Sequence, residues 1–325
     1  MKTKRIYIDT YGKPDVLRYG DIAIDEPGIN DVLIHHKAIG VNYIDIYHRT
    51  GLYPVSLPSG LGLEGVGIIE AVGKKVKDLS VGDRVGYASA PIGAYAEKRI
   101  MPADRLVKLP DFLSDDEAAT IMLRGLTVEY LVRRTFSLEA HHTLLLQAAA
   151  GGLGLLLCQW AKYIGATVIG TVGSKEKYEK AKMAGCDHVI ISSEEDIAQK
   201  VRLFTNDQGV DVVYDGVGKA TFENSLDCLK PRGLMVSFGN ASGPVGQVDL
   251  AMLNKKGSLF LTRPSLAHYT LTRQELLEGA DALFDVLKKG AVKTQLAYRY
   301  PLKDAGLAHK MLESRKVTGS IILTV

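Results

Sequence analysis

The stretch Thr143-Leu-Leu-Leu-Gln-Ala-Ala-Ala-Gly-Gly-Leu-Gly154 decides the fold, and it runs directly into Leu155-Leu-Leu-Cys-Gln-Trp-Ala-Lys162. Its three consecutive leucines do not alternate with polar residues, which is typical of a strand covered on both faces of a parallel sheet. Gly151 and Gly152 let the backbone approach a ligand, and Gly154 lets the following helix pack close to the strand. The sequence therefore predicts a buried strand, a glycine turn, and a helix whose first N–H groups bind a diphosphate.

The glycine spacing indicates dinucleotide binding only together with the strand that follows it. Ala149-x-Gly151-x-x-Gly154 is the dinucleotide fingerprint with alanine in place of the first glycine, and alone it fits a plain strand-turn-helix equally well. Residues 166–173 add a second β-rich strand, which completes the βαβ unit that the fingerprint requires. We therefore predict that this unit binds a dinucleotide.

The end of the second strand indicates which dinucleotide is bound. An NAD site usually places Asp or Glu about 20 residues beyond the glycines, where it holds the ribose 2′-hydroxyl. Here no carboxylate ends the strand, and Gly173-Ser-Lys-Glu-Lys177 follows it. Lys175 or Lys177 alone would fit a solvated helix start. Together with the missing acid, the hydroxyl and the two ammonium groups favour the 2′-phosphate of NADP.

Composition describes an ordinary globular chain. Its 325 residues suffice for two domains, and 46% hydrophobic with 24% charged residues is typical of soluble proteins. A net charge of +3 implies no strong field for nucleic acid or an anionic membrane. Cys158, Cys186 and Cys228 are odd in number and set in apolar or helical patterns, which predicts reduced core thiols in a cytoplasmic protein. No signal-peptide pattern or membrane-span-length apolar run is present.

The first hundred residues read as short strands separated by turns, which predicts a partly closed β-barrel. The clearest strands are expected at residues 32–40, 65–73, 82–87 and 93–100. Residues 41–54 predict a helical turn and loop rich in tyrosine, and we expect the substrate pocket there. His48, in this segment, is expected to be an exposed loop histidine.

A second region alternates strands and helices. Ser114 and Glu117 form a predicted capping box, after which two helices are expected at residues 115–122 and 126–135. Further strands are expected at residues 188–191, 211–215, 233–239 and 258–262. Such alternation predicts a doubly wound parallel sheet. A helix over residues 274–289 and a strand ending at Thr324 are expected to return to the first domain.

Taken in order, these motifs resemble the medium-chain dehydrogenase/reductase superfamily, specifically its zinc-free quinone oxidoreductases related to ζ-crystallin. The resemblance covers essentially the whole chain and rests on residues 37–45, 51–54, 125–127, 147–154, 214–215, 217–218, 237–240 and 262–265. It implies an α/β protein with a GroES-like β-barrel catalytic domain from residues 1–122 and 266–325. It also implies a Rossmann domain over residues 123–265, NADPH as hydride donor, a quinone as acceptor, and a homodimer.

The resemblance also bears on metal. Zinc-dependent members carry a cysteine where this chain has Asn42 and Gly-His-Glu where it has Gly62-Leu-Glu64, and they hold a four-cysteine zinc lobe. No cysteine precedes Cys158, so neither zinc site can be built from thiolates. His35 and His36 are neighbours on a strand and point to opposite faces, so they cannot chelate one ion together. We predict that the protein binds no metal.

Site residues follow from the same resemblance. The nicotinamide is expected beside Asn42, Tyr47, Tyr53, Thr127 and Tyr130, and the diphosphate beside Gly151, Gly152 and Leu153. The 2′-phosphate is expected beside Gly173, Ser174 and Lys177, and the ribose and ring beside Gly216, Phe238, Gly239 and Asn240, with Arg263 and Arg315 closing the site. Relatives often carry a tyrosine near Ser192, so this contact on the adenine side departs from the family pattern.

Asn42, Tyr47 and Tyr53 are the candidate catalytic residues. Hydride transfer requires the two reacting atoms within about 3 to 3.5 Å, so catalysis consists largely of positioning, with a donor for the charge that develops on oxygen. A phenol can hydrogen-bond a quinone carbonyl and stack on its ring, although each tyrosine fits half-buried packing equally well. Asn42 is a polar amide in an apolar stretch and needs a partner.

Two other functions fit the same motifs. An NADPH-dependent enone or 2-alkenal reductase would share the fold and cofactor and differ in the pocket. A ζ-crystallin-like role as an RNA-binding or structural protein belongs to another class, and the motifs leave it open. Nucleic acid is nevertheless not an expected partner, because the net charge is small.

Overall fold

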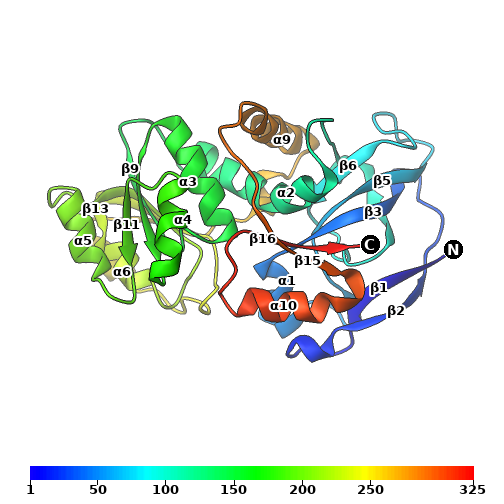
Figure 1. The fold of residues 1–325 in the computed structure, drawn as a ribbon, viewed down its shortest axis with the longest axis horizontal. Coiled ribbons are helices and arrows are strands. Elements are labelled where there is room, and N and C mark those ends of the chain that lie inside the picture. The colour runs from blue at the N-terminus through cyan, green and yellow to red at the C-terminus, as the bar shows by residue number, and fades with distance from the viewer. The chain divides into compact units, whose positions relative to one another are not determined.

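The computed structural model describes all 325 residues and divides them into two compact units. Unit 1 comprises Met1–Leu126, Thr270–Phe284 and Thr294–Val325, and unit 2 comprises Thr127–Tyr269 and Asp285–Lys293. Both chain ends lie in unit 1 (Figure 1). The domain boundaries expected from the resemblance, at residues 122/123 and 265/266, come a few residues before those of the units, and residues 285–293 were expected in the catalytic domain.

Unit 1 is built on a seven-stranded sheet. Its order is β15-β16-β3-β5-β6-β8, with β7 also pairing with β3. The strands are β3 (Asp31–Val41), β5 (Glu64–Val72), β6 (Arg84–Ala88), β7 (Lys98–Pro102), β8 (Val107–Lys108), β15 (Leu296–Pro301) and β16 (Ser320–Thr324). β3 pairs antiparallel with β5, β7 and β16, so it forms the centre of the sheet. The final strand therefore joins the first domain, as the sequence predicts.

A second, three-stranded sheet closes the same core. Its order is β2-β1-β4, from β1 (Lys2–Ile8), β2 (Arg18–Ala23) and β4 (Ser59–Gly60). Ile6 and Ile8 of β1 share one buried cluster with Ile34 and Ile39 of β3, which confirms the predicted barrel-like domain. The helices of this unit are α1 (Tyr43–Thr50), α10 (Ala305–Glu313), most of α9 (Arg273–Lys288), and the 3-10 turns η1 (Pro14–Val16), η2 (Ala103–Arg105) and η5 (Leu302–Asp304).

Unit 2 is a parallel six-stranded sheet with helices between its strands. The order is β11-β10-β9-β12-β13-β14, from β9 (Thr143–Leu146), β10 (Thr167–Val172), β11 (His188–Ile191), β12 (Val210–Asp215), β13 (Leu229–Ser237) and β14 (Phe260–Thr262). This is the 3-2-1-4-5-6 order of a dinucleotide-binding fold and confirms the predicted doubly wound sheet. Its helices are α3 (Gly152–Ile164), α4 (Tyr178–Met183), α5 (Ile197–Phe204), α6 (Phe222–Asp227), α7 (Leu250–Lys255), α8 (Leu266–Tyr269) and η4 (Lys175–Lys177).

The helix after the capping box differs from the prediction. α2 runs without interruption over Asp115–Tyr130 and continues as a π-helical turn, η3 (Leu131–Thr135), so two separate helices are wrong. Gly125 lies inside this helix, where an added Cβ would be 2.7 Å from both terminal methyls of Leu283 on α9. This glycine allows close packing. The capping box itself is confirmed, because the Ser114 N–H donates to Glu117 Oε2 at 3.0 Å.

The strand expected at residues 93–100 is wrong in its first half. β7 begins at Lys98, and Gly93 has a left-handed φ of 129°, while Ala96 makes only an isolated bridge with Arg5. β15 and α10 were not expected as separate elements. None of the helices is both long and apolar enough to span a bilayer.

Candidate active site

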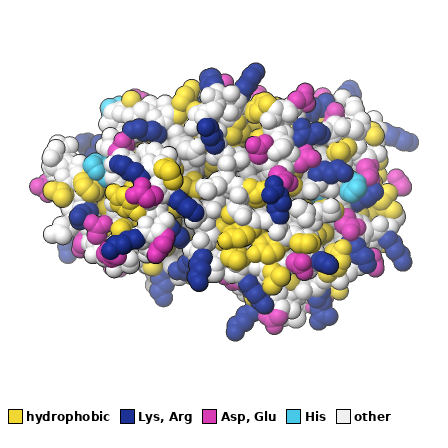
Figure 2. Space-filling model, in the orientation of Figure 1, with side chains coloured by type: hydrophobic (Ala, Val, Ile, Leu, Met, Phe, Trp, Pro, Cys, Tyr) yellow, Lys and Arg dark blue, Asp and Glu magenta, His cyan; other side chains and the backbone are white.

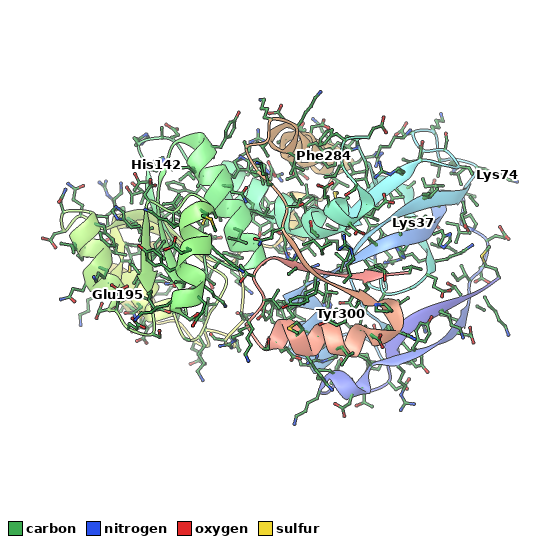
Figure 3. All side chains as sticks on the ribbon, viewed as in Figure 1. Lys37, Lys74, His142, Glu195, Phe284 and Tyr300 are labelled. Atoms are coloured by element: carbon green, nitrogen blue, oxygen red, sulfur yellow. The ribbon has the colours of Figure 1, made fainter.

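Most of the predicted cofactor residues in unit 2 stand where a strand of its sheet ends. They are Gly151, Gly152 and Leu153 in the turn after β9, Gly173 and Ser174 after β10, Ser192 after β11, Gly216 after β12, Phe238, Gly239 and Asn240 after β13, and Arg263 after β14. Parallel strands share one carboxyl edge, so the structure brings these residues to one edge of the sheet. Figure 3 labels His142 before β9 and Glu195 after β11, at opposite edges. The strand order reverses between β9 and β12, which is where open α/β sheets bind their ligands.

The turn after β9 has the shape that a diphosphate site requires. α3 begins at Gly152, and its N-cap Gly151 has no side chain to cap the first N–H groups. Those groups have no partner within a helix and attract anions. A Cβ on Gly154 would lie 2.5 Å from the Ala148 carbonyl oxygen and 2.7 Å from that of Ala149, so only glycine fits there. The turn therefore suits the dinucleotide predicted from the sequence.

A buried polar network holds the strand ends in place. Thr171 Oγ1 donates to Gln147 Oε1 at 2.7 Å, and Gln147 Nε2 donates to Ser225 Oγ at 3.0 Å. Ser225 Oγ in turn donates to Asp215 Oδ2 at 3.0 Å, while Asp215 Oδ1 accepts the Gly218 N–H at 3.0 Å. Because every member is satisfied, the network fixes the ends of β9, β10 and β12 without an orphaned polar group.

The loops after β12, β13 and β14 contact one another closely. A Cβ on Gly216 would lie 2.9 Å from the ring of Phe238, and a Cβ on Gly239 would lie 2.4 Å from the Gly216 carbonyl oxygen. Arg263 Nη1 donates to the Ser237 carbonyl oxygen at 2.6 Å. The guanidinium of Arg263 is therefore held at the carboxyl end of β13, beside the loop that carries Asn240.

The end of β10 has the features expected for a 2′-phosphate. A Cβ on Gly173 would meet no atom within 4 Å, and Ser174 is the N-cap of η4. Partial burial and the nearby Lys180 ammonium lower the pKa of Lys177, so an anion beside Lys177 would stabilise its charged form. Ser192 donates its Oγ–H to the Val172 carbonyl oxygen at 3.1 Å, which ties the end of β11 to this corner.

Thr127 and Tyr130 occupy the last turn of α2, in unit 2, and both are buried. The Tyr130 ring stacks on Tyr269, with 4.3 Å between ring centroids and 9° between planes. Burial raises the pKa of Tyr130, so its phenol stays protonated and keeps its hydrogen-bond donor at neutral pH.

In unit 1 the three catalytic candidates lie on α1 and the loop after it. Asn42 is the N-cap of α1, and its backbone N–H donates to Asp45 Oδ2 at 2.8 Å. The Asn42 side chain donates through Nδ2 to Glu64 Oε2 at 2.7 Å. The rings of Tyr47 and Tyr53 pack edge to face, with 5.2 Å between centroids. Arg315 follows α10 in the same unit, with a left-handed φ of 58°.

His48 contradicts the expectation of an exposed loop histidine. It lies on α1 and is only 7% exposed, with its ring packed near Tyr53 at 6.3 Å between centroids. Burial lowers the pKa of His48, and its Nδ1 has no hydrogen-bond partner. The expectation failed because α1 turns this side chain inward, which a tyrosine-rich segment without clear periodicity does not reveal.

A buried chain of hydrogen bonds behind α1 was not expected from the sequence. Arg49 Nη1 lies 3.1 Å from His309 Nδ1, His309 Nε2 lies 3.0 Å from Tyr95 Oη, and Tyr95 Oη donates to Asp45 Oδ2 at 2.9 Å. Arginine can only donate, so His309 accepts at Nδ1 and carries its proton on Nε2. Burial raises the pKa of Asp45 to about 7. A capping box at Asn42 could have indicated Asp45, whereas Tyr95 and His309 are remote in sequence.

The histidines of β3 lie in separate environments, as predicted. His36 contacts the Ala96 carbonyl oxygen at 2.6 Å and Tyr87 Oη at 2.7 Å in the core, whereas His35 is partly exposed and lies 3.1 Å from Glu70. No three His, Cys, Asp or Glu side chains converge as a metal site would require.

Two family models match the chain, one for each kind of domain. The alcohol dehydrogenase GroES-like domain covers residues 28–111, and the zinc-binding dehydrogenase domain covers residues 152–285. A GroES-like domain joined to a parallel dinucleotide-binding sheet defines the medium-chain dehydrogenase/reductase class. The model that matches residues 152–285 is called zinc-binding, but this chain lacks the cysteines of the zinc sites.

Full-length relatives narrow the class. A quinone oxidoreductase of Pseudomonas aeruginosa is 49% identical over 98% of this chain and 99% of its own length. The crystal structure of Escherichia coli quinone oxidoreductase complexed with NADPH is 48% identical, with a TM-score of 0.97 over 99% of this chain and 100% of that one. A 2-haloacrylate reductase of Burkholderia sp. is 42% identical over 96% of both chains. The chain belongs to the quinone oxidoreductase family.

Proposed function

We propose that this chain is an NADPH:quinone oxidoreductase that transfers a hydride to a quinone-type acceptor without zinc. The observation that carries the proposal is the end of β10, where Gly173, Ser174 and Lys177 stand in place of a carboxylate. That corner suits a 2′-phosphate, and the solved E. coli relative was complexed with NADPH. When bound, NADPH supplies the hydride.

The carboxyl edge of the unit 2 sheet holds the cofactor. The first turn of α3, with Gly151, Gly152 and Leu153, receives the diphosphate, and Lys177 with Ser174 receives the 2′-phosphate. Gly216, Phe238, Gly239 and Asn240 flank the ribose and ring, and Thr127, Tyr130 and Arg263 complete the site on this unit. The resemblance also assigns Arg315 to the cofactor, and Ser192 stands near the position where relatives often carry a tyrosine on the adenine side.

Asn42, Tyr47 and Tyr53 act on the acceptor. Their amide and hydroxyl donors stabilise the negative charge that develops on the acceptor oxygen as the hydride arrives. The rings of Tyr47 and Tyr53, which pack edge to face, suit contact with a flat acceptor. A quinone accepts hydride readily, so hydrogen bonds suffice where oxidation of a simple alcohol normally needs a Lewis acid.

The remaining assignments extend this proposal. Residues 1–122 and 266–325 form the catalytic domain and residues 123–265 the NADPH-binding domain of a cytoplasmic homodimer. Buried, unpaired thiols suit the cytoplasm. Nucleic acid is not an expected partner, because the net charge is only +3 and Figure 2 shows basic and acidic side chains interspersed on the face drawn.

An acceptor screen tests the function. With NADPH in excess, steady oxidation followed at 340 nm is expected with 1,4-benzoquinone and 9,10-phenanthrenequinone. The 2-haloacrylate reductase relative makes reduction of activated alkenes the second candidate, so 2-alkenals and 2-haloacrylates belong in the screen. Turnover restricted to these alkenes would replace the quinone assignment, and binding of NADPH without any turnover would contradict both.

A further inference from the structure

Glu64 is a carboxylate without exposed surface at the start of β5. Its Oε2 accepts the 2.7 Å hydrogen bond from Asn42 Nδ2, and its Oε1 accepts the backbone N–H of Leu123 at 2.7 Å. The positive charge of Arg124, which is also buried, favours the ionised carboxylate. A buried carboxylate is tolerated only with such donors, so both oxygens of Glu64 have defined partners.

The backbone of β3 makes room for this carboxylate. A Cβ on Gly40 would overlap the Glu64 carboxylate and would lie 2.6 Å from the Ala119 carbonyl oxygen. Glu64 therefore packs against the bare backbone of Gly40, which lies two residues before Asn42. It has no space to adopt a second position without moving β3 or α2.

The hydrogen bond to Glu64 decides which way the Asn42 amide faces. Above its pKa, the ionised Glu64 carboxylate can only accept, so Nδ2 of Asn42 must point toward Glu64 and Oδ1 away from it. The backbone of Asn42 is fixed as well, because its N–H donates to Asp45 Oδ2 at 2.8 Å. One amide hydrogen is thus committed, and the directions of the other hydrogen and of Oδ1 are set.

We propose that Glu64 is a positioning residue: its buried carboxylate holds the Asn42 side-chain amide in one orientation and so determines which group Asn42 presents to the acceptor. The proposal rests on the function proposed above, in which Asn42 contacts the acceptor. Glu64 acts through Asn42 and does not itself touch the substrate. The charged or titratable groups that face Glu64 are Arg124 of α2, Asp45 of α1, Tyr87 of β6, and Tyr95.

Glu64→Gln nearly keeps the shape of the side chain but reverses the direction of its hydrogen bond with Asn42. The backbone N–H of Leu123 still requires an oxygen, so the carbonyl of the new amide faces Leu123 and its NH2 group faces Asn42. Two NH2 groups cannot share a hydrogen bond, so the Asn42 amide must turn and present Oδ1. The flip moves the second amide hydrogen of Asn42, whose direction the bond to Glu64 sets, away from the acceptor oxygen. The expected result is a loss in kcat of roughly tenfold to a hundredfold, with the Kd for NADPH unchanged.

A double-mutant cycle tests whether Glu64 acts through Asn42. In an Asn42→Ala background, Glu64→Gln is expected to lower kcat no further, because the two changes remove the same interaction. Multiplicative losses would overturn the proposal. Glu70→Gln, on the same strand but paired with Lys98 at the surface, is the matched control and should leave kcat unchanged.

Glu64→Asp provides a second variant in case loss of the charge opposite Arg124 impairs folding. It keeps the charge opposite Arg124 but withdraws it by one methylene from Asn42, so the same fall in kcat is expected. Full kcat in Glu64→Asp, with Asn42→Ala impaired, would overturn the positioning role and leave the proposed function standing.

A readout without substrate separates the two proposals. The side-chain NH2 resonances of Asn42, assigned by their loss in Asn42→Ala, should show in the 15N–1H spectrum one proton shifted downfield by Glu64. In Glu64→Gln that shift should disappear. An unchanged spectrum would refute the inference even in an active enzyme, whereas a wild-type protein that reduces no quinone would refute the proposed function alone.

Discussion

The thiol sulfurs of Cys158 and Cys186 lie 3.3 Å apart beneath the glycine turn. Cys158 is on α3, and Cys186 precedes β11. Gly170 of β10 makes room for the pair, because a Cβ there would lie 2.6 Å from Cys186 Sγ. The contact with Cys186 and burial raise the pKa of the Cys158 thiol well above its ordinary value, so Cys158 remains protonated at neutral pH.

Native protein should therefore be inert to thiol reagents. All three cysteines are buried, and only a thiolate reacts quickly with an aromatic disulfide reagent such as 5,5′-dithiobis(2-nitrobenzoate). Labelling at pH 7.5 should be negligible over minutes in the native protein and should reach three thiols per chain in guanidinium chloride. A fast-reacting thiol in the native state would contradict the burial of the pair.

Lys177 should discriminate between the two dinucleotides. Replacing Lys177 by Ala is expected to raise the Kd for NADPH roughly tenfold to a hundredfold, the value of a charge-assisted hydrogen bond, and to leave the Kd for NADH nearly unchanged. Fluorescence titration of both cofactors measures this. Lys175→Ala is the control, because the Lys175 side chain is 73% exposed and its ammonium pairs with Glu194. Equal losses for NADPH and NADH would remove the 2′-phosphate assignment.

Catalysis should not depend on a metal. Asn42 and Leu63 occupy the positions of zinc ligands, and no cysteine precedes Cys158. Quinone reduction is therefore expected to survive exhaustive dialysis against a chelator, and elemental analysis should find no stoichiometric zinc. Ethanol oxidation, assayed in parallel, should be absent. Robust ethanol oxidation that the chelator abolishes would overturn the proposed mechanism.

The tyrosine hydroxyls should each contribute modestly. Tyr47→Phe and Tyr53→Phe keep the edge-to-face packing and remove one donor each. We expect kcat with a quinone to fall by at most roughly ten- to a hundredfold, less than for a dedicated oxyanion hole, because a quinone accepts hydride readily. Unchanged kcat in both variants would indicate that the rings serve packing alone.

Two pairs of buried groups should oppose each other in the pH dependence of stability. Burial raises the pKa values of Glu64 and Asp45 to about 7, so their stabilising protons are fully held below pH 4 and lost as the pH rises toward 7. Burial lowers the pKa values of His36 and His309 from 6.5 to about 3, so their contribution is present above pH 6.5 and lost as the pH falls toward 3.

Replacing Glu64 should therefore change how the free energy of unfolding depends on pH between about pH 4.5 and 6.5. In Glu64→Gln, the free energy of unfolding should rise with pH more steeply than in the wild type, by up to about 1.4 kcal/mol per pH unit. Urea unfolding followed by circular dichroism at several pH values measures the slope. A parallel pair of stability curves would mean that Glu64 is ionised at pH 4.5 in the folded protein.

Periodicity and glycine spacing were sufficient for the strand-turn-helix at Thr143, because each βα unit there is local. They failed for α2, which was expected as two helices, because the close contact of Gly125 with Leu283 that accompanies the continuous helix is made only by folding. The interpretation of Asn42 as a polar group in need of a partner was sound, yet its partner Glu64 lies on another strand and no local pattern connects them. The chain from Arg49 through His309 and Tyr95 is likewise created only by folding.

The pairing of β3 with β16 places Val41 opposite Ile321, with all of unit 2 between them in the sequence. The parallel sheet of unit 2 can close through successive local crossovers, whereas this edge of β3 must wait for a strand 280 residues further along the chain. Until β16 arrives, the backbone of residues 38–41 is an open sheet edge, able to pair with another chain. Refolding at high protein concentration would therefore place the segment just before Asn42 at risk of aggregation.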